Sequence, residues 1–439
     1  METEDIIVIS DLHIAASCGS GLFQSDKELA GFLKWICKET RHCSLVLNGD
    51  VFDFLVAREP KALVDAKGFA SQAALMIKNH AEAFEALSLL ADSPKHRLFI
   101  IGGNHDPEAI FPEVQSAIAG ELKQSYRHLP IRWLVNGEAL SLDVGQAKIL
   151  IEHGDQYDDW NYIDHETLRR LVSLNTRGLD GGDVYKPPPG SYLVINRFNP
   201  IRERFPWIER LQPLNFKVLS LILDLIMPKL ERGEQFALWG AVKEVERMSR
   251  RAAMNEAFRR LNPETEFWGE ADNGRQRFIE WRGEIQEADT WGKAEPDFAS
   301  MTKRLRKVSA GDGFFDIEKP DHSFNTVNRL TGFGNDLVIH GHTHAAKAYR
   351  VGKGLYLNSG TWAQLMRLPA SDASEEEWTE FLKRLDRGEA DSFSRPTFIH
   401  VTVRNEVVRA ELCEWIEGAP LVKSAWIFEQ DKSAWHQEG

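Results

Sequence analysis

Five short apolar segments of this sequence are each followed at once by Asp, Asn or His residues. The segments are rich in β-branched and other aliphatic residues, which is the pattern of buried strands. Helical patterns separate several of them, so the sequence predicts an α/β fold. Open α/β sheets place their sites at strand ends, so the five polar groups are expected to meet. These groups are Asp11 to His13, Asn48 to Asp53, Gly102 to Asp106, Glu152 to Asp155 and His340 to His344.

The polar groups supply a mixed set of oxygen and nitrogen ligands without thiolates. Imidazole, carboxylate and amide ligands suit Mn²⁺, Fe or Zn²⁺ better than Ca²⁺, which prefers sites made of oxygen alone. Seven ligands are too many for one ion, but they fit two ions that share a carboxylate. Two such ions, roughly 3.5–4 Å apart, can clamp a phosphoryl group and lower the pKa of a water between them. The candidate ligands are Asp11, His13, Asp50, Asn104, His153, His342 and His344.

Composition excludes several other classes of protein. The chain has 439 residues, of which 43% are hydrophobic and 27% charged, as in a globular protein. The formal net charge of −13 argues against a protein that binds nucleic acid through an overall positive surface. Its 4 cysteines are too scattered for a disulfide framework. No signal peptide is visible and the most apolar stretch, Val218 to Met227, is too short to cross a bilayer, so we expect a cytoplasmic protein.

A long segment of different character lies between the fourth and fifth polar groups. We expect residues 156–334 to form a mostly helical cap, residues 1–155 and 335–415 the core, and residues 416–439 a C-terminal tail. Between Ser191 and Arg260 the cap carries 13 Lys and Arg side chains against 8 Asp and Glu. Arginine binds phosphate with two parallel hydrogen bonds, so Arg197, Arg250 and Arg251 are candidates for substrate binding. The alternative is that these arginines form salt bridges on solvated helix faces.

The motifs DLH, GDVFD, GNHD, HGD and GHTH, in that order, resemble those of the calcineurin-like metallophosphoesterases. The resemblance covers the expected core and implies a four-layer α/β/β/α sandwich with metal ions at the strand ends. It also implies two divalent ions, with Mn²⁺ as the expected metal and Fe, Zn²⁺ and Mg²⁺ as alternatives. By motif position, the first ion would be held by Asp11, His13 and His344, the second by Asn104, His153 and His342, and both by Asp50.

The same resemblance implies a general acid that is not a metal ligand. His105 matches the family's histidine that protonates the leaving-group oxygen, and Asp53 matches the carboxylate that orients it. The alternative interpretation of Asp53 is a helix cap, and that of His105 a hydrogen-bonding residue behind the ligands. Asp106 and Asp155 fit supporting or capping roles better than ligation. His340 fits a buried core histidine.

The resemblance defines a chemistry and leaves the substrate open. We expect hydrolysis of a phosphodiester or phosphomonoester, whose class (nucleotide, nucleic acid or nucleotide sugar) is unresolved. A second interpretation is a pyrophosphatase like UDP-2,3-diacylglucosamine hydrolase, although that branch usually has Arg at the position of His105. A phosphoprotein phosphatase fits less well, since GDxxD is followed here by Phe54 and Leu55 and the third motif ends in Asp106. A non-catalytic metal-binding scaffold is the remaining alternative.

Overall fold

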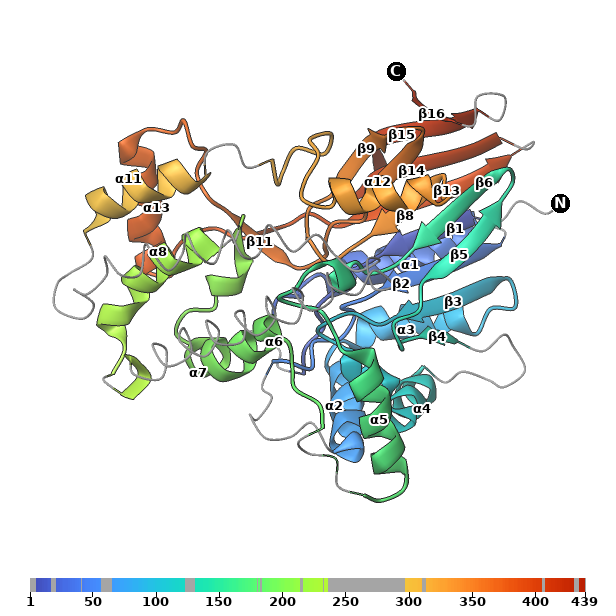
Figure 1. Cartoon of the computed structure of the whole chain (residues 1–439), viewed down its shortest axis with the longest axis horizontal. Coiled ribbons are helices and arrows are strands. Elements are labelled where there is room, and N and C mark those ends of the chain that lie inside the picture. Colours follow the sequence, from blue (N-terminus) through green and yellow to red (C-terminus); the bar gives the residue numbers. More distant parts are fainter. Residues whose placement is uncertain are drawn as a thin grey trace, which may run out of the picture. The chain divides into compact units, whose positions relative to one another are not determined.

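The computed structural model of the chain divides into two compact units (Figure 1). Unit 1 comprises Met1–Pro187, Phe315–Ala363 and Ser394–Gly439, and unit 2 comprises Pro188–Phe314 and Gln364–Phe393. Among the helices that the structure describes, none is long and apolar enough to span a bilayer. The described residues are 5–16, 21–40, 42–56, 65–122, 131–179, 181, 184–213, 216–231, 233–235, 297–309, 313–404, 407–429 and 434–438.

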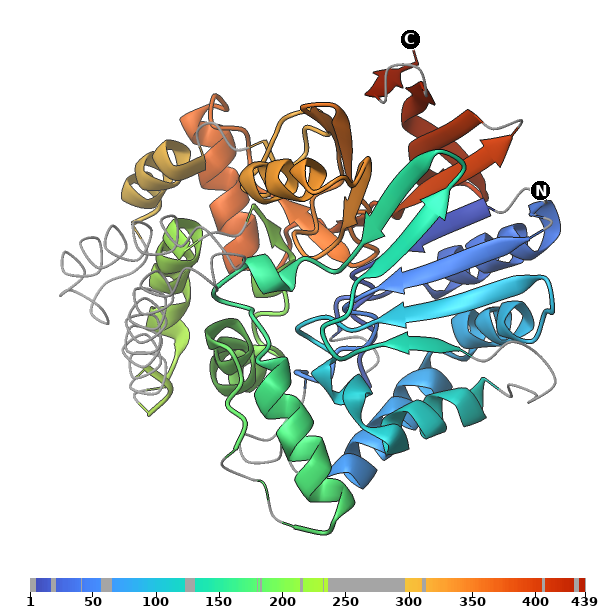
Figure 2. The same cartoon turned by 45° about the vertical axis from the view of Figure 1, so that its right-hand side comes forward.

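Unit 1 contains two large sheets, and the larger one has eight strands (Figure 2). Three neighbouring pairs, β1–β2, β2–β3 and β3–β4, are parallel, whereas β13 to β16 join antiparallel. Because β1, β2 and β3 run in the same direction, the residues that follow them emerge at one edge of the sheet. In sheet order the strands are β16 (Ala434–Gln437), β15 (Ala419–Glu429), β14 (Val407–Ile416), β13 (Thr397–Arg404), β1 (Asp5–Ile9), β2 (Cys43–Asn48), β3 (His96–Ile101) and β4 (Arg132–Leu134).

The other large sheet of unit 1 has five strands. Its central strands are parallel, β6 to β8 and β8 to β10, and each outer strand joins antiparallel. In sheet order the strands are β5 (Leu140–Val144), β6 (Ala147–Ile151), β8 (Leu337–His340), β10 (Gly354–Asn358) and β9 (Lys347–Val351).

Side chains alternate between two apolar clusters along the strands of the eight-stranded sheet. In β1, Ile7 and Ile9 pack with helices α1 to α5, whereas Ile6 and Val8 pack with side chains of the five-stranded sheet. Successive side chains of a strand point to opposite faces of the sheet, which explains the alternation. Both faces are apolar because helices cover one and the five-stranded sheet covers the other. The prediction of an α/β fold is confirmed.

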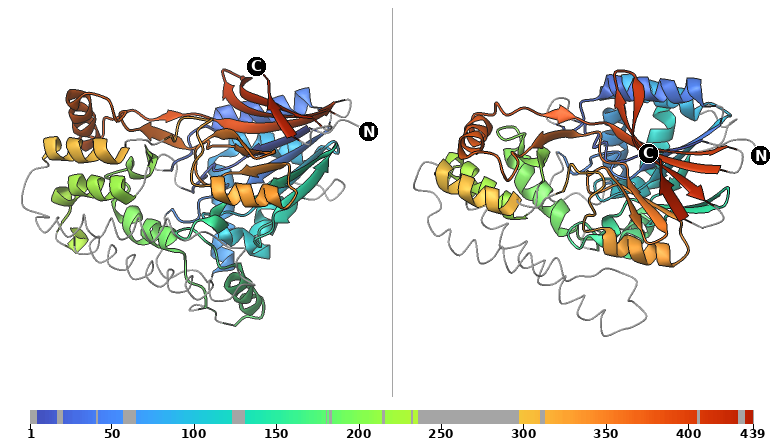
Figure 3. Two further views of the ribbon diagram at one scale, coloured as in Figure 1. Left: turned by 45° about the horizontal axis from the view of Figure 1, so that its top comes forward. Right: turned by 90° about the horizontal axis from the view of Figure 1, so that it is seen from above.

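Helices of unit 1 cover the outer faces of the two sheets, with α1 and α12 on opposite sides (Figure 3, right). Helix α12 packs on the five-stranded sheet through Val327 and Leu330, which share a cluster with Val338 and Tyr356. The helices of this unit are α1 (Asp26–Glu39), α2 (Ala66–Asn79), α3 (Ala81–Ala91), η1 (Pro107–Ile110), α4 (Pro112–Glu121), η2 (Asp155–Tyr157), α5 (His165–Thr176) and α12 (Phe324–Gly332).

Unit 2 is mainly helical in the part that the structure describes. Helix α13 begins with a complete capping box between Ser374 and Glu377, and it buries Trp378 and Leu382. The elements of this unit are α6 (Pro189–Leu193), η3 (Val194–Phe198), α7 (Asn199–Ile201), η4 (Ile208–Arg210), β7 (Leu211–Gln212), α8 (Phe216–Ile226), η5 (Met227–Lys229), α11 (Phe298–Ser309), β11 (Gln364–Arg367) and α13 (Glu375–Asp386), with β12 (Phe393–Ser394) at its border.

The boundaries between the two units differ from those expected between the core and the cap. Helix α5 stays with unit 1 because Leu168 and Leu171 are buried in its apolar cluster, and α12 stays there through Val327 and Leu330. Unit 2 instead gains residues 364–393, which the sequence placed in the core.

Residues 416–439 do not form the expected tail, because 419–429 and 434–437 are the strands β15 and β16. Trp435 explains why this segment is ordered: its side chain is fully buried, packs on Phe428 and donates to the Asp336 carbonyl at 2.7 Å.

His165, at the start of α5, makes the stability of unit 1 depend on pH. Burial, followed by the nearby Arg169, lowers the pKa of His165 from 6.5 to about 4. Since the folded pKa lies below the unfolded one, this contribution is complete above pH 6.5 and is lost as the pH falls towards 4. Between pH 7 and pH 5 we expect a loss of about 2 kcal/mol in the free energy of unfolding.

Urea unfolding of the parent and of His165→Gln at both pH values tests this. The variant should lose the His165 part of the pH dependence, so an unchanged difference between pH 7 and pH 5 would contradict the assignment.

Candidate metal centre

Five of the predicted ligands share an unusual backbone conformation. The φ angles are 54° at Asp11, 52° at His13, 51° at Asp50, 66° at His342 and 59° at His344. For residues other than glycine this left-handed region costs on the order of 1 kcal/mol or more each, and such conformations concentrate at functional sites. In each case the chain bends directly after a strand, and the bend turns a side chain into the space between the strand ends.

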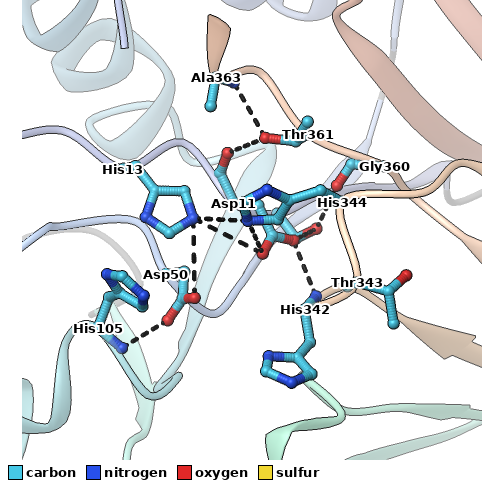
Figure 4. Close-up of polar contacts among 12 residues, drawn as sticks. Asp11, His13, Asp50, His105, His342, Thr343, His344, Gly360, Thr361 and Ala363 are labelled. Atoms are coloured by element: carbon cyan, nitrogen blue, oxygen red, sulfur yellow. Dashed lines mark hydrogen bonds and ion pairs between the residues drawn. The ribbon is translucent and has the colours of Figure 1, made fainter. Parts of the chain in front are cut away.

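Asp11, His13 and His344 form a first cluster (Figure 4). The Nε2 atoms of His13 and His344 lie 2.9 Å apart. Asp11 Oδ1 lies 3.4 Å from His344 Nε2 and 3.9 Å from His13 Nε2. The other Asp11 oxygen, Oδ2, is occupied: it accepts from the Ser10 hydroxyl and, at 3.0 Å, from the His342 amide. One oxygen of Asp11 therefore faces the two imidazoles while the other is fixed by hydrogen bonds.

Asp50, His153 and His342 form a second cluster. His153 Nε2 lies 3.3 Å from Asp50 Oδ2, and the rings of His153 and His342 are 5.3 Å apart. Asp50 Oδ2 is also 3.8 Å from His13 Nε2, so this carboxylate lies between the two clusters. Its other oxygen, Oδ1, accepts the His105 amide at 2.8 Å.

Hydrogen bonds define which nitrogen of His153 is available. Its Nδ1 is 2.8 Å from the Asn48 carbonyl, which can only accept, so Nδ1 carries the proton and Nε2 has a free lone pair. This pairing of a ring N–H with a carbonyl is typical of metal-bound histidines. Gly49 makes the contact possible, because a Cβ at that position would lie 2.2 Å from His153 Nδ1.

The electrostatics of the second cluster favour a positive charge. Burial alone would raise the pKa of Asp50, but the nearby His153 and His105 hold it well below its usual range. Burial would likewise lower the pKa of His153, but Asp50 and Asp11 raise it well above its usual range. The buried carboxylates thus attract positive charge, which a divalent cation can supply in place of protonated imidazole.

The residues fit a metal ion. In the described part of the chain, four buried atoms of the predicted ligands have no hydrogen-bond partner: Asp11 Oδ1, His13 Nδ1, Asn104 Oδ1 and His153 Nε2. A buried polar atom without a partner costs about 1–3 kcal/mol, which a cation bound to the two oxygens and to His153 Nε2 would offset. The predicted ligand set consists of the carboxylate, amide and imidazole groups that suit Mn²⁺, Fe or Zn²⁺.

His105 and Asp53 lie together beside the first cluster. His105 Nδ1 is 3.3 Å from Asp53 Oδ1, and the rings of His105 and His13 meet edge to face at 4.5 Å. Asp53 Oδ1 also accepts the Leu55 and Val56 amides, so the carboxylate holds the turn as well as the imidazole. Burial alone would raise the pKa of Asp53, but His105 and His13 lower it, and the group is ionised.

Two further buried residues, Asp106 and His340, lie close to the predicted ligands in the chain and make hydrogen bonds around them. Asp106 accepts the amides of Val51, Phe52 and Gly103 and so ties two of the ligand loops together. Burial, with Asp50 as the next cause, raises the pKa of Asp106 to about 7. His340 is buried, with Nε2 3.0 Å from Glu152 Oε1.

Burial raises the pKa of Asp155, which begins the short helix η2, to about 6. Among the residues described, it belongs to none of the three candidate metal groups, which are the two clusters above and a third made of His13, Asp50 and His105.

The sequence reasoning missed Asp158, whose Oδ2 lies 3.1 Å from His342 Nε2. The only local signal is an acidic residue five positions after His153. Arg197 belongs to unit 2, where it donates to the Asn196 carbonyl, and Arg250 and Arg251 lie outside the described residues.

Comparison with known proteins gives one family match. Residues 5–207 match the model of the calcineurin-like phosphoesterase family, a range that includes four of the five motifs and ends before GHTH. A search of curated proteins finds no match. Among solved structures, the chain is similar to a conserved uncharacterized protein of Streptococcus pneumoniae TIGR4, titled a predicted phosphoesterase. The identity is 10%, the coverage 96% of this chain and 98% of that chain, and the TM-score 0.24, which is too low to carry an argument.

Proposed function

We propose that this chain, whose residues 5–207 match the calcineurin-like phosphoesterase family, hydrolyses a phosphodiester or phosphomonoester with two divalent ions, Mn²⁺ being the expected metal. The family makes it a metal-dependent phosphoric ester hydrolase. One observation carries the two-ion proposal: the Asp50 carboxylate lies 3.8 Å from His13 in one cluster and 3.3 Å from His153 in the other.

The proposed ligands divide as the two clusters do. Asp11, His13 and His344 would hold one ion, and Asn104, His153 and His342 the other, with Asp50 shared. Ions bound there would lower the pKa of a water molecule and stabilise the charge that develops on the phosphoryl oxygens.

His105 is the proposed general acid. Its side chain is 17% exposed whereas the Asp53 carboxylate is 2% exposed, so the imidazole can reach solvent and substrate while its partner stays buried. Asp53 keeps the ring oriented through Nδ1, and Nε2 is then the atom that would deliver a proton to the departing oxygen.

A substrate screen with added metal tests the function. Protein stripped of metal and then given Mn²⁺ should cleave bis-p-nitrophenyl phosphate or p-nitrophenyl phosphate, and EDTA should remove at least about 99% of the rate. Single-stranded DNA, cyclic nucleotides and UDP-sugar diphosphates complete the panel.

Faster cleavage of the diester than of the monoester would support the phosphodiester proposal. Cleavage restricted to the UDP-linked diphosphates would replace it with the pyrophosphatase interpretation. No hydrolysis of any phosphoester by protein shown to carry metal would overturn the proposal.

A further inference from the structure

A short turn after the fourth motif touches the second cluster from outside. Asp158 and Asn161 belong to this turn, which directly follows η2 in unit 1. The turn is closed by the Asp158 carbonyl, which accepts the amides of Asn161 at 2.9 Å and Tyr162 at 2.8 Å. Neither side chain belongs to the proposed ligand set, and both are fixed by contacts to it.

The carboxylate of Asp158 determines which nitrogen of His342 is free. All its hydrogen bonds are accepted ones: Oδ1 takes the Trp160 amide at 3.0 Å, and Oδ2 takes the Asn161 amide group at 2.8 Å. His342 Nε2, 3.1 Å from Oδ2, therefore donates its proton. The lone pair of the ring is then on Nδ1. The main chain of His342 is held separately by Asp11, and its ring extends away from the first cluster (Figure 4).

The same carboxylate determines, through Asn161, which atom of Asn104 is free. The NH₂ group of Asn161 donates to Asp158, so the Asn161 oxygen, Oδ1, is left to accept a hydrogen bond. This oxygen lies 3.5 Å from Asn104 Nδ2. Asn104 then presents Oδ1 as its remaining atom, and this oxygen is buried and has no hydrogen-bond partner among the described residues. If the Asn104 amide had the opposite orientation, its oxygen would face the Asn161 oxygen, which leaves two acceptors without a donor.

We propose that Asp158, acting directly on His342 and through Asn161 on Asn104, positions two ligands of the second ion and so sets the affinity of that ion alone. The proposal rests on the two-ion function above. The first cluster does not depend on Asp158, since Asp11 is held by Ser10 and by a main-chain amide, and His13 and His344 face each other. Outer partners of metal ligands typically change metal affinity 10–100-fold.

Calorimetric titration of metal-free protein with Mn²⁺, with bound metal counted by elemental analysis, gives a readout other than activity. The parent should bind two ions. Asp158→Ala should bind the first with unchanged affinity and the second about 10–100-fold more weakly. Asn161→Ala should show a smaller loss at the same ion. Asp159→Asn, an exposed neighbour with the same loss of charge as Asp158→Asn, should match the parent.

Asp158→Asn separates positioning from the mere presence of a carboxylate. The amide oxygen of the variant can still accept from both His342 and Asn161, although its NH₂ group then faces the Trp160 main-chain amide. The variant should therefore bind the second ion more tightly than Asp158→Ala and more weakly than the parent. If Asp158→Ala does not fold, as judged by circular dichroism, Asp158→Asn and Asn161→Ala carry the test.

The outcomes are distinct. Parental affinity for both ions in Asp158→Ala, or an Asp158→Asn variant that binds the second ion no more tightly than Asp158→Ala, would overturn the positioning role and leave the function intact. A parent that binds a single ion would instead overturn the two-ion function.

Discussion

Asp50→Asn is expected to lower kcat at least about 1000-fold, which corresponds to about 4 kcal/mol of transition-state stabilisation. The variant keeps the size of the side chain but removes the charge that lies between His13 and His153. Without that carboxylate, neither cluster retains a full ligand set, so bound metal measured by elemental analysis should fall below two ions per chain. Steady-state kinetics with added Mn²⁺ gives the rate.

A matched control is Asp143→Asn, which removes a carboxylate from the exposed face of β5 and should leave rate and metal content unchanged. If Asp50→Asn kept full activity and both ions, the shared-ligand role would be refuted. If it lost one ion and kept the other, Asp50 would belong to a single ion.

His105→Ala is expected to retain both ions and to lose rate according to the leaving group. Metal should stay because His105 contacts Asp50 through its main-chain amide, which the substitution preserves. The rate with an alkyl phosphoester should fall about 10²–10⁴-fold, the usual contribution of a general acid. With p-nitrophenyl esters the fall should be much smaller, because nitrophenolate leaves without a proton.

The comparison of leaving groups is the decisive measurement for His105. An equal fall with both esters would show that the residue is not the acid. Loss of an ion would show that it is a ligand, a role compatible with its position near His13 and Asp50.

The sequence was informative where chemistry is local. Each ligand pair with i, i+2 spacing directly follows a strand, so Asp11 with His13 and His342 with His344 could be placed at strand ends. Their meeting followed from the parallel order of the strands. The start of helix α13 is likewise encoded within four residues, by the capping box of Ser374 and Glu377.

What the sequence did not predict depends on contacts between distant residues. Asp158 and His342 are 184 residues apart, and no spacing rule links them. The strands β15 and β16 were taken for a tail although a turn precedes them. At that turn Glu417 and Gly418 have φ angles of 51° and 84°, so the pair Glu-Gly was the overlooked sign of a hairpin.

The left-handed backbone at the ligand positions restricts which amino acids evolution can try there. Among residues with a side chain, Asp, Asn and His enter this region several-fold more often than others, while β-branched residues almost never do. The three types include the oxygen and nitrogen ligands proposed here at Asp11, His13 and Asp50, all of which have positive φ angles. A substitution at one of these positions must therefore provide a suitable ligand atom and also tolerate a positive φ angle. This double requirement limits the range of metal ions that descendants of this sequence can come to bind.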